Sequence, residues 1–159
     1  MKPIPLLLEA LKKSHTNRHL VLTGSVGRGK STLLQAYLKE LPPAYVVRTH
    51  VDKEHRHIWA QLPSGTIIEL AYFDRGFHAY EEGFFQLLTA MKKESVGYER
   101  IVIDEVGHVE TQVPSYIEEI LNLSKEKTMI YVVRKDRSPF WDRIDALQDH
   151  SLFDLDHCY

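Results

Sequence analysis

Short apolar runs alternate with amphipathic segments along the whole chain. The apolar runs are rich in branched and aromatic residues and end at glycine, proline or charged residues, which is typical of strands. The predicted strands are His19–Thr23, Tyr45–Val51, His55–Leu62, Thr66–Tyr72, Arg100–Asp104, Thr128–Val133 and Leu152–Leu155. Between them, apolar residues recur at helical spacing. The predicted helices are Leu6–Lys13, Lys30–Leu41, Phe77–Met91, Ser115–Leu123 and Pro139–Leu147.

This alternation predicts an α/β fold of three layers, in which helices cover both faces of a mainly parallel central sheet. The turn Pro63-Ser64-Gly65 between two of the strands adds an antiparallel hairpin to it. No internal repeat or flexible linker divides the chain. We therefore expect a single domain over residues 1–159, with residues 1–18 as a helical N-terminal extension that covers a face or edge of the sheet.

Composition and charge narrow the classes of partner. Lys plus Arg is 20 and Asp plus Glu is 22, a formal net charge of −2, which argues against binding nucleic acid or an anionic membrane by bulk charge. No apolar run has the length of a spanning helix, and Glu9 and Lys12 interrupt the N-terminal leucines. The single cysteine, Cys158, excludes an intramolecular disulfide. A cytoplasmic location is the expectation.

A glycine-rich segment separates the first predicted strand from the helix after it, and it has the GxxxxGK[ST] pattern of a phosphate-binding loop. Glycines let successive backbone N–H groups converge on phosphate oxygens, and the helix N-terminus adds partial positive charge. Lys30 is expected at the β- and γ-phosphates, the Ser31 hydroxyl on Mg²⁺ and Thr32 near the α-phosphate. The alternative is a glycine-rich turn that merely contains Lys-Ser, and the flanking strand and helix disfavour it. The predicted nucleotide-binding residues are Gly24, Ser25, Val26, Gly27, Arg28, Gly29, Lys30, Ser31 and Thr32.

Two carboxylates end the strand that begins at Arg100. Parallel strands present their carboxyl ends along one edge, so Asp104 is expected to face the phosphate loop as the second protein ligand of Mg²⁺. Glu105 follows and is expected to orient and deprotonate a water aimed at the γ-phosphorus. The alternative, an ordinary acidic strand end, is disfavoured by the phosphate loop upstream.

A basic loop, Arg134-Lys135-Asp136-Arg137, follows the strand Thr128–Val133. Arg134 is expected either to neutralise charge on the transferring phosphoryl group or to grip the base or the α-phosphate. For Lys135 and Arg137, a solvated basic loop is an equally good interpretation.

Three of the nine histidines, His50, His55 and His57, lie close together in the sequence. His55 and His57 would share one face of a strand. A metal site is one interpretation, but no cysteine or carboxylate joins them at a recognised ligand spacing, which favours exposed strand histidines.

Three motifs in order resemble the small nucleoside-triphosphatase family first known from thermophiles, which is also described as nucleotide-kinase-like. They are Gly24–Thr32, Ile103-Asp104-Glu105-Val106-Gly107-His108-Val109-Glu110 and the run from Arg134 to Ile144. The resemblance implies a RecA-like P-loop fold and slow, Mg²⁺-dependent hydrolysis of several nucleoside triphosphates, with Glu105 activating water and Arg134 in the site. The chain departs from the family at Val133, where histidine is frequent, and at His108, where lysine is common.

Taken together, the sequence predicts an Mg²⁺-dependent hydrolase of ATP, GTP and other nucleoside triphosphates, with Lys30, Glu105 and Arg134 as its catalytic residues. Two alternatives are open. One is a nucleotide or small-molecule kinase that transfers the γ-phosphoryl group to an acceptor. The other is a nucleotide-gated module that acts with a protein partner.

Overall fold

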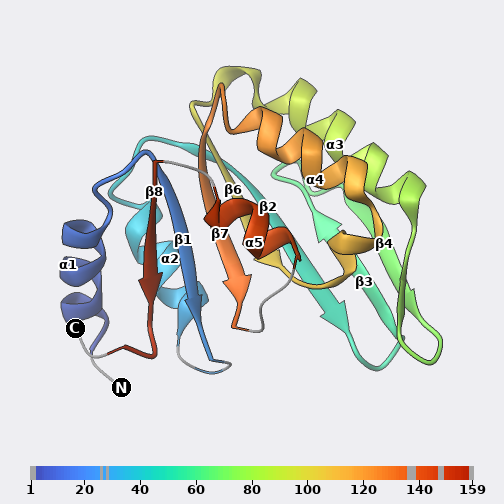
Figure 1. Cartoon of the computed structure of the whole chain (residues 1–159), viewed down its shortest axis with the longest axis horizontal. Coiled ribbons are helices and arrows are strands. Elements are labelled where there is room, and N and C mark those ends of the chain that lie inside the picture. The colour runs from blue at the N-terminus through green and yellow to red at the C-terminus, as the bar shows by residue number, and fades with distance from the viewer. Residues whose placement is uncertain (1–2, 26, 28, 136–138, 147–148, 158–159) are drawn as a thin grey trace.

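The central feature of the molecule is one sheet of eight strands in the order β5-β4-β3-β2-β6-β7-β1-β8 (Figure 1). The computed structural model describes residues 3–25, 27, 29–135, 139–146 and 149–157. The strands are β1 (His19–Gly24), β2 (Ala44–Asp52), β3 (His57–Gln61), β4 (Ile67–Phe73), β5 (Phe77–Ala79), β6 (Arg100–Val106), β7 (Thr128–Arg134) and β8 (His150–Asp154). The α-helices are α1 (Ile4–Ser14), α2 (Lys30–Leu38), α3 (Glu81–Glu94), α4 (Pro114–Leu123) and α5 (Pro139–Asp145), and short 3₁₀ turns cover Ser95–Gly97 and Val109–Gln112.

The sheet is parallel on one side and antiparallel on the other. β2 pairs with β6, β6 with β7, β7 with β1 and β1 with β8, all in parallel. β3, β4 and β5 continue the sheet from β2 as antiparallel strands. The prediction of a mainly parallel sheet with an antiparallel addition is therefore confirmed.

Helices cover both faces of this sheet and give the molecule three layers (Figure 1). Along β6, Ile101 and Ile103 pack with α3, α4 and α5, whereas Val102 between them packs on the opposite face with α1 and α2. Side chains alternate between the faces of a strand, so a strand buried on both sides must be apolar at every position. This is why the parallel strands are continuous apolar runs in the sequence.

The N-terminal helix α1 packs against α2 and β8 at one side of the molecule (Figure 1). Leu7 and Leu11 are buried in the same core cluster as Leu33 and Phe153. The expectation that this helix covers the sheet face near its edge agrees with that packing.

One predicted helix begins too early. Phe77–Ala79 was expected to open a helix that reaches Met91, but it forms β5, which pairs with β4. The turn before it has positive φ at Arg75 and Gly76, which folds the chain back on itself. Tyr80, expected on the buried side of that helix, is consequently exposed, and α3 begins at Glu81.

Helix α3 then crosses β4 very closely at Gly83. A Cβ atom built on Gly83 would lie 2.0 Å from the carbonyl oxygen of Glu69, so the helix requires glycine at this position. The remaining helix end differences are small: α2 ends at Leu38 rather than Leu41, and Leu147, the predicted end of α5, is outside the described residues. Within the described residues, no helix combines the length and the apolarity needed to cross a membrane.

Candidate nucleotide site

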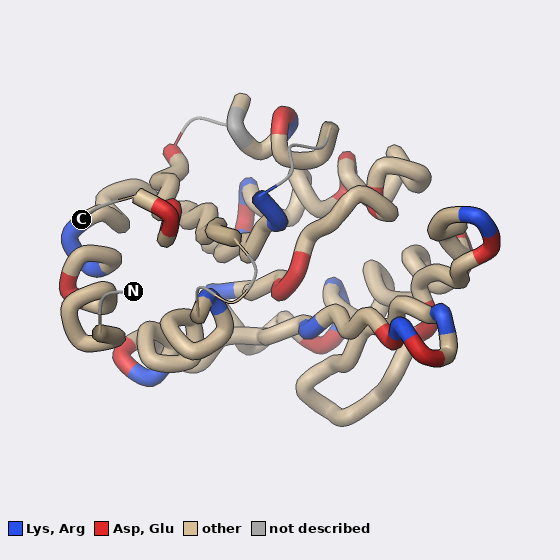
Figure 2. The backbone as a smooth tube through the Cα atoms, turned by 90° about the horizontal axis from the view of Figure 1, so that it is seen from below, with Lys and Arg blue, Asp and Glu red and all other residues tan. Residues whose placement is uncertain are grey.

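The carboxyl ends of β1, β2, β6, β7 and β8 lie along one edge of the sheet, because these strands are parallel. Figure 2 views the molecule from this side, and acidic and basic backbone positions lie near one another in its centre. In open α/β sheets, ligands bind in the crevice outside this edge. The predicted site residues are therefore expected at this edge of the sheet.

The phosphate-binding pattern connects β1 to α2 at this edge. β1 ends at Gly24 and α2 begins at Lys30, as the motif requires. Gly27 and Gly29 have φ of 81° and 84°, a left-handed backbone that glycine adopts without strain. Ser31 and Thr32 are exposed in the first turn of the helix. Val26 and Arg28, two of the predicted nucleotide contacts, lie outside the described residues.

The Glu105 carboxylate lies between the phosphate-loop lysine and the arginine of β7. Its Oε2 is 3.5 Å from Lys30 Nζ, and its Oε1 is 3.9 Å from Arg134 Nε. The first residue of α2 and the carboxyl ends of β6 and β7 thus bring together the three side chains that the sequence predicts as catalytic. One carboxylate flanked by two cations is an arrangement suited to phosphoryl chemistry, in which charge must be neutralised around a nucleophile.

Asp104 lies one residue earlier on β6, next to β2. Its Oδ2 is 4.0 Å from Arg48 Nη1. Burial, followed by the neighbouring Glu105 carboxylate, raises the pKa of Asp104, and Arg48 and Lys30 oppose that rise. The Asp104–Glu105 peptide bond is cis. Two adjacent carboxylates, one of them largely buried, create negative potential that a divalent cation would offset.

A pocket of about 350 Å³ opens beside Glu105 and Arg134, between β2, β3, β5 and the 3₁₀ turn Val109–Gln112. Glu110, which is 4% exposed, lies in its wall, and Glu110 Oε2 accepts a hydrogen bond of 3.0 Å from the Gly107 backbone N–H. Burial raises the pKa of Glu110 to about 7. The pocket volume falls at the lower end of the usual range for small-molecule sites.

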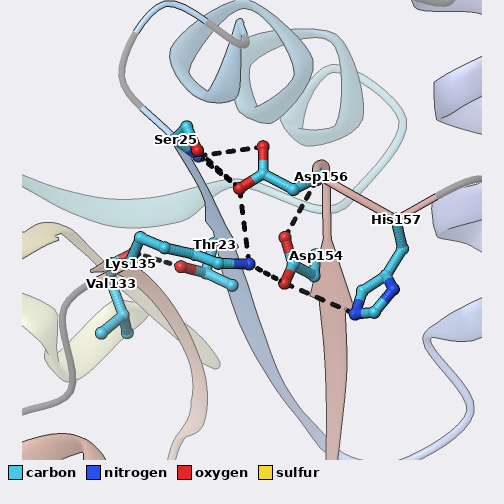
Figure 3. Close-up of polar contacts among 7 residues, drawn as sticks. All are labelled: Thr23, Ser25, Val133, Lys135, Asp154, Asp156 and His157. Atoms are coloured by element: carbon cyan, nitrogen blue, oxygen red, sulfur yellow. Dashed lines mark hydrogen bonds and ion pairs between the residues drawn. The ribbon is translucent and has the colours of Figure 1, made fainter.

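The start of the phosphate loop is bonded to the end of β8 (Figure 3). The Asp156 carboxylate accepts hydrogen bonds from Ser25, from its backbone N–H at 3.0 Å and from its hydroxyl at 2.7 Å. Lys135 forms an ion pair with Asp154 and lies 3.4 Å from Asp156 Oδ2. The hydrogen bonds from Ser25 and the ion pair with Lys135 lower the pKa of Asp156 to about 2.

The comparisons with known proteins agree with this geometry. A family model described as "AAA domain" matches residues 12–134, which is most of the chain. The chain belongs to this AAA domain family of P-loop proteins. The crystal structure of THEP1 from the hyperthermophile Aquifex aeolicus is similar, with a TM-score of 0.67 and 17% sequence identity over 86% of this chain and 89% of that chain. At that identity the likeness shows the fold alone. No curated protein matches the sequence.

Membership of the AAA domain family supports nucleotide binding at the phosphate loop. The matched region contains the loop, Asp104, Glu105 and Arg134, and it ends before β8. The contact of Asp156 with the loop in this AAA domain therefore lies beyond the part of the chain that the family model describes.

The two described cations of the basic segment at the end of β7 have different partners, because Arg134 lies beside Glu105 and Lys135 does not. Lys135, expected to be either a nucleotide contact or a solvated cation, is held by the carboxylates at the end of β8. Arg143 forms an ion pair with Glu118 of α4, as expected for a helix surface residue. Arg137 lies outside the described residues.

The three neighbouring histidines contact different partners. His50 stacks on Trp59, with ring centroids 4.2 Å apart. His55 lies in a turn, not on a strand, with its Nδ1 2.8 Å from Asp52 Oδ2. His57 begins β3, with its Nδ1 3.8 Å from Glu69 Oε1. Among the described residues, no group of three or more His, Cys, Asp or Glu is arranged to hold a metal ion.

Sequence reasoning missed several polar residues of this AAA domain. Asp154 lies near the end of the predicted strand Leu152–Leu155, and Asp156 follows it. The rule that selects Asp104, an acidic residue at the carboxyl end of a strand, selects these two residues as well. Glu110 stands in the acidic motif but carries no spacing signal of its own. Arg48 reaches Asp104 because β2 and β6 pair Arg48 with Asp104 in register, which only the structure reveals.

Proposed function

We propose that the protein is an Mg²⁺-dependent nucleoside triphosphatase that hydrolyses ATP, GTP and other nucleoside triphosphates to the diphosphate and phosphate. The observation that carries this proposal is the position of Glu105, with one carboxylate oxygen beside Lys30 and the other beside Arg134. In P-loop proteins the equivalent lysine contacts the β- and γ-phosphates. A carboxylate 3.5 Å from that lysine is therefore within reach of a water next to the γ-phosphorus.

In the proposed reaction, Lys30 and the loop N–H groups hold the phosphates. The phosphate oxygens compete with Glu105 for the Lys30 ammonium and free its carboxylate. Glu105 then orients the attacking water and accepts its proton. Arg134 neutralises charge that develops on the γ-phosphoryl oxygens.

The available donors fit Mg²⁺, which prefers oxygen ligands. Asp104 offers a largely buried carboxylate beside Glu105, and Ser31 offers a hydroxyl at the start of α2. These two residues would hold the ion. When bound, Mg²⁺ supplies positive charge to the phosphate oxygens.

The decisive experiment compares Glu105→Gln and Lys30→Ala with the unaltered protein. Phosphate release is measured with Mg²⁺ and each of ATP, GTP, CTP and UTP, and binding is measured separately with a fluorescent nucleotide. Glu105→Gln should bind nucleotide and lose about 10²- to 10⁴-fold in turnover, since the amide cannot accept the proton. Lys30→Ala should lose nucleotide binding.

Glu54→Gln and Lys13→Ala, at exposed positions away from the loop, serve as matched controls and should behave as the unaltered protein. Hydrolysis by Glu105→Gln at the unaltered rate would contradict the role of this carboxylate. Nucleotide binding by the unaltered protein without any phosphate release would favour a nucleotide-gated binding module instead.

Transfer of the γ-phosphoryl group to a small acceptor is a second candidate function. The pocket of about 350 Å³ beside Glu105 favours it, because hydrolysis alone requires room for no more than a water.

A further inference from the structure

The pocket beside Glu105 begins where the proposed triphosphate would end. Glu105 and Arg134 form the boundary between the pocket and the nucleotide site. The rest of the pocket is lined by β2, β3, β5 and the 3₁₀ turn Val109–Gln112, away from the phosphate loop. A molecule in this pocket would thus approach the γ-phosphoryl group from the side on which Glu105 lies.

The pocket has one apolar and one polar wall. Val51, Ile58 and Phe77, from β2, β3 and β5, line the apolar wall together with Val109. The polar wall includes Glu105 and Arg134 at the ends of β6 and β7 and Glu110 in the 3₁₀ turn Val109–Gln112. Such a division suits a ligand that has a short apolar body and a polar end.

The pocket wall is held in place by hydrogen bonds between elements. Gln112 Nε2 donates to the Phe77 carbonyl and its Oε1 accepts from the Ala79 N–H, both at 2.8 Å. The Thr111 hydroxyl donates to the His108 carbonyl at 2.6 Å. The two Gln112 bonds tie the 3₁₀ turn to β5 and the Thr111 bond closes the turn itself, so the pocket is preformed rather than a gap between loose segments.

The charged side chains in the pocket determine which sign of charge a ligand can carry. Among the described residues that line it, Arg134 is the sole lysine or arginine, and the proposed function assigns it to the triphosphate. Two acidic side chains, Glu105 and Glu110, then line the pocket together with His108. Burial raises the pKa of Glu110 to about 7, and a cation placed beside it would favour its ionised form. An acceptor with its own phosphate would be repelled, whereas a ligand with one ammonium group would be attracted.

We propose that this pocket binds a small hydroxyl compound with one positive charge, in the simplest case an amino alcohol, as acceptor of the γ-phosphoryl group. The proposal rests on the nucleotide site described above and assigns a second substrate to it. The apolar body would pack on Val51 and Phe77, the ammonium would face Glu110 and the hydroxyl would face Glu105.

The groups of the site and the two substrates account for every bond and proton of this reaction. The acceptor oxygen forms a bond to the γ-phosphorus, and the bond from that phosphorus to the oxygen bridging it to the β-phosphate breaks. The nucleoside diphosphate leaves, and the hydroxyl proton passes to Glu105. Hydrolysis is the same step with water in place of the acceptor, so it continues more slowly when the pocket holds no acceptor.

The test combines Mg²⁺-ATP labelled at the γ-phosphate with three classes of probe. Tyramine, ethanolamine and 3-aminopropanol are charged amines, ribose and uridine are neutral hydroxyl compounds, and uridine monophosphate is anionic. Phosphate release and phosphorylated acceptor are measured side by side. We expect phosphorylation of at least one of the amino alcohols, weaker transfer to the neutral compounds and no transfer to the monophosphate.

Two variants locate the acceptor. Val51 is 45% exposed, and Val51→Phe should fill the apolar wall and lower transfer at least about tenfold through a raised acceptor KM. Val96→Phe, at a valine that is 78% exposed in the 3₁₀ turn after α3, is the matched control and should leave both reactions unchanged. Glu110→Gln should reduce the preference for amines over neutral compounds about tenfold, since one charge-assisted contact is lost.

The outcomes separate this proposal from the proposed hydrolysis. Phosphate release without phosphorylation of any probe, or transfer that prefers the monophosphate, overturns the acceptor proposal and leaves hydrolysis standing. Neither release nor transfer overturns both. Transfer to amines that Val51→Phe does not weaken places the acceptor elsewhere and overturns the assignment of this pocket.

Discussion

Glu110 is a carboxyl group that the fold removes almost completely from solvent. It is 4% exposed, and its close partner is the backbone N–H of Gly107. Glu105 and Arg134 act on it with opposite charges, and its own charge acts on the buried Tyr116. Burial outweighs these contacts and raises its pKa from 4.5 to about 7. The ionised form is therefore costly in the folded protein.

This cost makes stability depend on pH. The folded protein holds a proton on Glu110 that the unfolded chain releases between pH 4.5 and about 7, so the free energy of unfolding falls as pH rises through that interval. The fall amounts to about 3 kcal/mol for a shift of this size. Glu110→Gln removes the charge and keeps an oxygen for the Gly107 N–H.

We expect Glu110→Gln to match the unaltered protein near pH 4.5 and to be more stable above pH 7, by up to about 3 kcal/mol. Urea denaturation at a series of pH values measures this difference. Glu82→Gln, at an exposed position in α3, controls for titration elsewhere. Curves that stay parallel at all pH values would mean that Glu110 does not titrate in this range.

At the residue scale, the sequence indicated the site residues that follow a general rule for P-loop sheets. It missed the site residues whose position depends on how two distant strands pair. Lys30, Asp104 and Glu105 follow the rule that a phosphate loop and an acidic strand end face each other across parallel strands. Arg48 comes beside Asp104 through the pairing of two strands far apart in the sequence. No local pattern contains that information.

At the scale of elements, α1 shows how a helix outside the phosphate-loop core contributes to it. One face of the helix is buried and the other is exposed. Leu11 on the first face is fully buried, whereas Leu6 on the second is 60% exposed. Leu11 belongs to the core cluster that also holds Leu33 and Leu34 of α2. The helix that begins at Lys30 is therefore held on its outer side by α1.

Leu11→Ala should lower the free energy of unfolding by about 2–5 kcal/mol, because it removes buried methyl groups and leaves a cavity. Leu6→Ala in the same helix should change it by less than about 0.5 kcal/mol. Urea denaturation of both variants measures the difference. Equal effects of the two substitutions would show that α1 does not pack on α2 in solution.

The pattern of apolar residues predicted most of the helices and strands. Parallel strands are buried on both faces, so each is a continuous apolar run that is easy to recognise in the sequence. The pattern failed at Phe77–Ala79, where three residues with Tyr80 and Phe84 fit helical spacing equally well. A strand this short carries too few residues to display its own period. Gly76 before it was the local sign of a turn.

At the scale of the whole molecule, the first and last strands of the sheet meet beside the phosphate loop. β1 lies between β7 and β8, and the carboxylate after β8 holds Ser25 (Figure 3). The loop is thus positioned by the last strand as well as by the helix that follows it.

Asp156→Ala should weaken nucleotide binding by about two- to tenfold, since the charge-assisted bonds to Ser25 are lost while the phosphate contacts remain. Titration with a fluorescent nucleotide measures the dissociation constant. Asp74→Ala, at an exposed turn between β4 and β5, is the control and should leave affinity unaltered. An unchanged affinity in Asp156→Ala would show that the loop holds its shape without β8.

The place of β8 beside β1 also sets an order for events during synthesis. The loop motif leaves the ribosome early, yet β8 and Asp156 come more than a hundred residues later. Contacts of such separation form late, since a long loop must first close. The nascent chain therefore carries its phosphate-binding sequence long before β8 can complete the site, and nucleotide stabilises the fold in full only after β8 has been synthesised.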